Sequence, residues 1–216
     1  MLAIVSDLHL TDGTTSNWAG DADLFNVKPG AFRLLYAKIA DAISRRTVTP
    51  RKVTLVFNGD IFDLLRTAEW FGVNEADRPW SVPLLKENVR RHCRTILKRT
   101  IQHNSESLSW LNGSHPDFPA VWGGNPEVER VYIPGNHDRI INLDRQCREL
   151  VHEHLLGRSG NGRFRNFYAD RDHQALAEQD HQTLVMHGHE GDPFNCEFDT
   201  SGNPRREEIP IGDPMT

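Results

Sequence analysis

The chain has 216 residues, of which 38% are hydrophobic and 25% are charged, and its formal net charge is -5. This length can bury a proper core, so we expect a single domain over residues 1–216. The composition excludes a chain that is disordered throughout. The acidic balance argues against a generally basic nucleic-acid binder, so nucleic acid is a possible but not a favoured partner.

The N-terminal apolar run and the cysteines indicate the cellular compartment of the protein. Residues 1–5 are apolar, but Asp7 and His9 interrupt the run, so it cannot serve as the core of a secretory signal. No later stretch reaches the length of a membrane span. The three cysteines are widely spaced, which fits reduced thiols better than a disulfide framework. We therefore expect a cytoplasmic protein with no membrane partner. The sequence carries no signal for an oligomeric state.

A strand, a helix and a second strand are predicted at the start of the chain. Residues 2–6 form a short apolar run that stops at Asp7 and leads into a polar loop. Apolar residues recur at helical spacing over 31–46, and 52–57 read as a buried strand. A strand–helix–strand order is typical of a right-handed crossover in a sheet that helices cover. We therefore expect an α/β fold in which the polar residues after each strand share one rim.

Residues 64–129 depart from this alternation and are predicted to form an insertion or cap-like segment. It holds a helix over about 83–103 and a loop over 112–126. The charged side of the helix carries Arg90, Arg91, Arg94, Lys98 and Arg99. We favour a solvated helix face for these charges; the alternative is a basic edge that attracts phosphate-bearing substrates. We expect the segment to form part of the pocket walls.

The remaining elements follow in order. Residues 130–133 are predicted to form the third strand, 142–156 a helix, and 164–168 and 183–186 two further strands. Residues 192–216 have several prolines, glycines and charges and no core-forming period, so we expect a loose tail.

Side chains that can hold a metal follow four of these predicted strands. Residues two apart on an extended chain point the same way, so such a pair can grip one cation together. Each group alone could be an ordinary polar turn, and Asp60 or Asp63 could cap a helix. Together they form a mixed set of oxygens and imidazoles, which suits manganese, iron or zinc rather than calcium. The groups are Asp7 with His9, Asp60 with Asp63, Asn136-His137-Asp138, and His187 with His189.

These motifs, in this order, resemble those of the calcineurin-like metallophosphoesterase superfamily. They are Asp7-Leu8-His9, Gly59-Asp60-Ile61-Phe62-Asp63, Gly135-Asn136-His137-Asp138 and His187-Gly188. The resemblance implies a four-layer α/β/β/α sandwich with two divalent transition metal ions, manganese foremost and iron or zinc as alternatives. It also implies metal-dependent hydrolysis of a phosphate mono- or diester, with a bridging hydroxide as nucleophile. The substrate would be a phosphorylated molecule of a type that the resemblance does not specify.

The resemblance further implies a role for each residue. The ligands would be Asp7 and His9 at the first metal, Asp60 bridging both metals, and Asn136 and His187 at the second. His137 would stabilise the phosphoryl charge and protonate the leaving oxygen, and Asp138 would fix the orientation of His137. Asp63 would support its own loop.

The chain departs from the family pattern at the end, because the closing Gly-His-x-His motif is absent. Residues 188–191 match the start of this motif, but the last position holds Gly191 instead of histidine. We favour the interpretation that His187 is the penultimate motif, that His189 is a neighbour or extra ligand, and that the closing motif lies beyond residue 216 or is lost. The fold would then be C-terminally incomplete. The alternative makes His187 and His189 the closing pair, with an upstream histidine as the penultimate ligand: His152, His154, His173 or His181.

The missing motif also leaves a second function open. A chain of this fold could bind metal without efficient turnover and act as a metal-binding interaction domain. Retention of His137 counts against this alternative, because a pure scaffold has no need of a proton donor.

Overall fold

A parallel β-sheet forms the centre of the structure, a computed structural model that describes residues 1–14, 26–80, 86–157, 163–164, 175–178, 183–192, 194–202 and 204–205. The sheet has the order β1-β2-β3-β4, and each neighbouring pair is parallel. Its strands are β1 (Leu2–Val5), β2 (Val53–Asn58), β3 (Val128–Ile133) and the two-residue β4 (Arg163–Phe164). Helix α1 (Pro29–Ser44) connects β1 to β2, as the strand–helix–strand pattern predicts.

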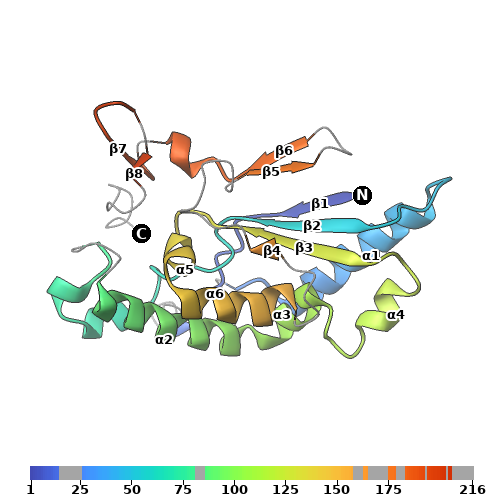
Figure 1. Ribbon diagram of the computed structural model, residues 1–216. Helices are drawn as coiled ribbons and strands as arrows, with labels where there is room; N and C mark the ends of the chain where they lie inside the picture. Colours follow the sequence, from blue (N-terminus) through green and yellow to red (C-terminus); the bar gives the residue numbers. More distant parts are fainter. Residues whose placement is uncertain are drawn as a thin grey trace.

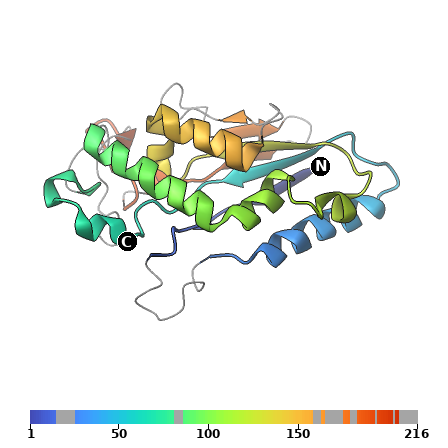
Figure 2. The same ribbon diagram turned by 90° about the horizontal axis from the view of Figure 1, so that it is seen from below.

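A layer of helices lies on one side of this sheet (Figures 1 and 2). Its members are α1, α2 (Glu87–His103), α3 (Ser105–Asn112), the short α4 (Phe118–Trp122) and α6 (Arg145–Val151), which continues into the π-helical turn η4 (His152–Leu156). Other short elements are η2 (Ala68–Gly72), η3 (Glu75–Asp77), α5 (Arg139–Leu143) and η7 (His189–Gly191). The predicted α/β class, with helices flanking a parallel sheet, is confirmed.

An antiparallel pair, β5 (Ala175–Glu178) and β6 (Thr183–Met186), lies on the other side of the parallel sheet (Figure 1). Val185 of β6 packs against Val56, Val131 and Ile133 of the sheet. The opposite face contributes Leu55, Phe57 and Tyr132 to the large hydrophobic core shared with the helices. The sheet is therefore buried on both faces, which explains why β2 reads as a continuous apolar run.

The predicted helix over 142–156 is broken at Asp144. This residue is extended, with φ -118° and ψ 122°, and its side chain accepts a hydrogen bond from the main-chain N–H of Cys147. Asp144 therefore ends α5 and caps the N-terminus of α6, a local role that an aspartate plays well and that apolar periodicity does not reveal.

The predicted loop over 112–126 contains the short helix α4. Gly113 adopts a left-handed conformation (φ 79°) that ends α3, and Pro119 lies in the first turn of α4. Proline is tolerated in the first turn of a helix and glycine at its end, so the residues that suggested a loop instead mark helix boundaries.

Residues 64–129 supply much of the helix layer. Three arginines of α2 pair with carboxylates there: Arg94 with Asp144 at 2.6 Å, Arg99 with Glu69 at 2.6 Å, and Arg90 with Glu87 at 3.1 Å. The Arg94 and Arg99 pairs therefore join α2 to the start of α6 and to η2, whereas the Arg90 pair lies within α2. None of the helices in the described ranges is both long enough and apolar enough to cross a bilayer.

The break at Asp144 generates a stability prediction. The Asp144 side chain caps α6 and binds the Arg94 guanidinium through both oxygens. We expect Asp144→Ala to lower the free energy of unfolding by about 2 kcal/mol, because it removes the cap of α6 and takes the buried carboxylate away from Arg94, which keeps its pair with the exposed Glu87. Urea denaturation followed by circular dichroism measures this change. The control is Glu149→Ala, which removes an exposed pair with Arg145 and should cost less than about 0.5 kcal/mol. Equal losses in the two variants would contradict the account.

Candidate metal centre

The metal-ligating residues predicted from the sequence gather where the strands end. Asp7 follows β1, Asp60 follows β2, Asn136 follows β3 and His187 follows β6. Main-chain hydrogen bonds join the first two loops: Asp7 N donates to Gly59 O at 3.1 Å, and His9 N donates to Asp60 O at 2.8 Å. The carboxyl ends of parallel strands meet at one edge of a sheet, and functional residues of open α/β sheets commonly lie there.

A first group consists of Asp7, His9 and Asp60. Each offers one ligand atom, and these atoms lie within 4.8 Å of one another. The His9 Nε2 atom is 3.9 Å from Asp60 Oδ2. Two carboxylates and an imidazole at this separation can hold one divalent cation.

A second group shares Asp60 with the first. The His187 Nε2 atom is 3.4 Å from Asp60 Oδ2 and 3.3 Å from Asn136 Oδ1. The other carboxylate oxygen of Asp60 accepts the main-chain N–H of His137 at 3.0 Å. This bond holds the carboxylate in place, so Oδ2 faces the imidazoles of both groups. Asp60 is therefore placed to bridge two cations.

Both candidate imidazole ligands are anchored through Nδ1. His9 Nδ1 donates to Asp63 Oδ2 at 3.2 Å, and His187 Nδ1 donates to the main-chain oxygen of Asn58 at 3.0 Å. A carboxylate or a carbonyl can only accept, so the proton must be on Nδ1. In the neutral imidazole Nε2 then carries the free lone pair, and this anchoring is the usual support of a metal-bound histidine.

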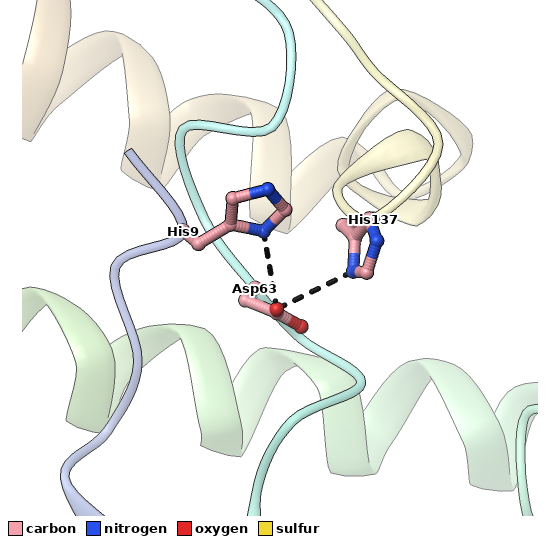
Figure 3. A group of neighbouring side chains, drawn as sticks. All are labelled: His9, Asp63 and His137. Atoms are coloured by element: carbon pink, nitrogen blue, oxygen red, sulfur yellow. Dashed lines mark hydrogen bonds and ion pairs between the residues drawn. The ribbon is translucent and has the colours of Figure 1, made fainter. Parts of the chain in front are cut away.

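His137 contacts the same oxygen of Asp63 as His9 does (Figure 3). Its Nδ1 is 3.3 Å from Asp63 Oδ2, and the two imidazole rings lie edge to face with centroids 4.7 Å apart. Burial opposes the charged imidazole, but the carboxylates of Asp63, Asp60 and Asp138 outweigh it and raise the pKa of His137. Asp63 is therefore placed to orient the ring, and it also accepts the main-chain N–H groups of its own loop.

Asp138 has a different task from the one predicted. Its fully buried carboxylate accepts main-chain N–H groups from Ile61 at 3.0 Å and Gly135 at 2.6 Å. Burial, together with the nearby Asp60 carboxylate, raises the pKa of Asp138 to about 6. The structure thus assigns the orientation of the His137 ring to Asp63, and Asp138 instead joins the loops after β2 and β3. Neighbours in sequence point apart here because the chain turns sharply between them.

The backbone is strained at three of the candidate ligands. Asp7, His9 and Asp60 have φ values of 54°, 45° and 51°, and they are the non-glycine residues with positive φ in the described part of the chain. Such conformations cost roughly 1–3 kcal/mol each and gather at functional sites. Three such residues in one cluster indicate that the backbone at this rim is shaped to direct the candidate ligand atoms rather than to maximise stability.

Two glycines make room for the central side chains. A Cβ atom on Gly135 would lie 2.1 Å from Asp60 Oδ1 and 2.6 Å from Asp60 N. A Cβ atom on Gly59 would lie 2.2 Å from His187 Nδ1. Both contacts are shorter than atoms allow, so these positions require glycine if Asp60 and His187 are to meet.

Charge pairing within the cluster fits a cation site. Burial would raise the pKa of Asp60, but His187 and His137 outweigh it and lower that pKa. Burial opposes the charged form of His187, yet Asp60 raises its pKa to about 9. The Asp63 carboxyl likewise has its pKa lowered, against burial, by His137 and His9. Imidazoles thus supply positive charge that the carboxylates need, and a cation would supply the same charge.

The predicted site residues, apart from Asp138, line one cavity of about 540 Å³. His189 is buried there, with its ring centroid 5.3 Å from that of His187. Asp192 and Asn195 also line it, although the sequence predicts a loose tail for them. Of the described residues that line this cavity, none comes from 64–129, so the expected contribution of this segment to the pocket walls stays a prediction.

Two of the alternative histidines lie away from this cavity. His152 and His154 belong to η4 in the helix layer, and His154 lines a separate cavity beside α2 and α3. His173 and His181 lie outside the described residues. The predicted strand over 164–168 is described only at its first residue.

Comparison with known proteins returned no matching family model, no matching curated protein and no matching solved structure.

The close approach of Gly135 to Asp60 gives a direct test of the rim. Gly135→Ala should displace the Asp60 carboxylate and weaken manganese binding by at least tenfold, because the added methyl group needs the space that Asp60 Oδ1 occupies. Isothermal titration of metal-free protein with Mn²⁺ measures the affinity. Gly191→Ala is the matched control, since a Cβ atom there meets nothing within 4 Å. Unchanged affinity in Gly135→Ala would show that Asp60 does not hold the metal in this position.

Proposed function

We propose that this chain is a metal-dependent phosphoesterase of the calcineurin-like metallophosphoesterase type, which hydrolyses a phosphate mono- or diester at a dinuclear metal centre. One observation carries the proposal. His9 and His187 are each anchored at Nδ1 by an acceptor, and their Nε2 atoms lie 3.9 Å and 3.4 Å from the same oxygen of the buried Asp60. His137, whose Nδ1 is 3.3 Å from Asp63 Oδ2, lines the same cavity. Two oriented imidazoles beside one carboxylate oxygen suit a catalytic metal site.

The chain offers two sets of metal ligands. Asp7, His9 and Asp60 would hold one cation, and Asp60, Asn136 and His187 the other. Imidazole, carboxylate and amide donors suit manganese, with iron or zinc as alternatives. When bound, two such cations polarise the phosphoryl oxygens and lower the pKa of water. His189 is a neighbour that could extend the second set.

His137 is proposed as the catalytic proton donor. Asp63 takes its Nδ1 side, which leaves Nε2 for the leaving oxygen of the substrate. The neighbouring carboxylates raise the pKa of His137, which favours the protonated imidazole that this task needs. Asp63 acts as a positioning residue because it also anchors His9, so one carboxylate sets the distance between a metal ligand and the proton donor.

The proposal includes the four-layer α/β/β/α sandwich. The helix layer, the parallel sheet and the β5–β6 pair support three of its layers. The substrate is a phosphorylated molecule, and the net charge of -5 disfavours long nucleic acids.

An assay on two model substrates tests the activity. Manganese-loaded protein is incubated with a mono-aryl phosphate and with a bis-aryl phosphate, and release of the phenol is measured. We expect hydrolysis of at least one substrate, lost on chelation and restored by manganese. Hydrolysis of neither, with metal bound, would refute the enzyme and favour the alternative, a catalytically inactive metal-binding interaction domain.

Two variants should separate metal holding from proton transfer. Asp60→Asn should lose both bound metal and turnover, because it weakens the one group that serves both cations. His137→Ala should keep its metal and lose about 10²- to 10⁴-fold in kcat, the range that general acid catalysis contributes. Metal content by mass spectrometry and steady-state kinetics measure the two effects. Equal metal loss in both variants would disprove this division of roles.

A further inference from the structure

Asn136 raises a problem of orientation. Its carboxamide has two unlike ends: the oxygen can hold a cation, whereas the NH₂ group can only donate hydrogen bonds. A half-turn about the last side-chain bond exchanges them with almost no change of shape. If Asn136 is a metal ligand, as the proposed function requires, some neighbour must keep its oxygen toward the cation.

Two successive hydrogen bonds link this carboxamide to Asn195 and, through it, to Asp192 in the turn after η7. Asn136 Nδ2 donates to Asn195 Oδ1 at 3.2 Å, and Asn195 Nδ2 donates to Asp192 Oδ2 at 2.7 Å. Asp192 is itself held in the turn, since its Oδ1 accepts the main-chain N–H of Phe194 at 3.0 Å. Its main-chain oxygen accepts the N–H groups of Asn195 and Cys196.

The direction of these bonds follows from the chemistry of Asp192. A carboxylate only accepts, so Asn195 must turn its NH₂ group toward Asp192 and its oxygen toward Asn136. That oxygen also only accepts, so Asn136 must turn its NH₂ group toward Asn195. The oxygen of Asn136 is then left facing His187 Nε2 at 3.3 Å.

We propose that Asp192 and Asn195 are positioning residues, which form with Asn136 an amide relay that keeps the Asn136 oxygen toward the second cation. This inference rests on the proposed function and adds two residues to it. The Asp192 carboxylate determines, through Asn195, which atom of the Asn136 side chain faces the second cation.

The relay can be removed without disturbing the fold. The backbone of Asn136 is held separately, because its main-chain oxygen accepts a hydrogen bond from Arg139 Nη1 at 2.6 Å. Asp192 is exposed and Asn195 is half-buried, so truncating either leaves the core intact. Variants of the relay should therefore change metal affinity and leave the thermal transition of the metal-free protein unchanged.

Titration of metal-free full-length chain with Mn²⁺ tests the relay. Asn195→Ala should weaken the second manganese site about tenfold, as the loss of a group that orients a metal ligand does. Asp192→Ala should weaken the same site in the same direction. Phe194→Ala, in the same turn but with an exposed side chain, is the control and should match the wild type.

The Asn195→Ala substitution, made in an Asn136→Asp variant, distinguishes an effect on the orientation of Asn136 from a general support of the site. In Asn136→Asp the two ligand oxygens are equivalent, so no neighbour is needed to choose between them. Adding Asn195→Ala there should leave manganese affinity unchanged or improve it, because the Asn195 oxygen no longer opposes a carboxylate. The same tenfold loss in both backgrounds, or wild-type affinity in Asn195→Ala, would overturn the relay. A wild-type chain that binds no manganese would overturn the proposed function as well.

Discussion

The Asp60 carboxylate is the group on which the rest of the rim depends. One of its oxygens accepts the N–H of His137, and the other faces His9 on one side and His187 on the other. It is 4% exposed, and a buried carboxylate is costly unless positive charge or hydrogen bonds surround it. The imidazoles and the strained loop after β2 are arranged around that requirement.

This requirement explains features that would otherwise destabilise the protein. Left-handed conformations at Asp7, His9 and Asp60 cost free energy. Glycine at positions 59 and 135 places no side chain at this end of the sheet. The strained conformations direct candidate ligand atoms toward one another around Asp60, and the two glycines leave room for those atoms. The sheet beneath is buried on both faces and is rigid enough to bear this strain.

A second theme is that orientation is controlled by groups outside the ligand sets. Asp63 fixes the rings of His9 and His137, the carbonyl of Asn58 fixes His187, and the amide relay fixes Asn136. In each case an acceptor that cannot donate determines which atom of its neighbour faces the cavity. In the candidate centre, each of these side chains that face the cavity is therefore paired with a second group that fixes its orientation.

The sequence by itself determined the α/β class, the order of the main strands and helices, and the residues gathered at the rim, because apolar periodicity and polar strand ends are local signals. The tertiary structure alone decided that His137 pairs with Asp63 rather than with Asp138, and that Asn195 links Asn136 to Asp192. Those partners are set by where the loops turn and pack. Spacing along a chain carries no record of which side chains meet across 50 or more residues.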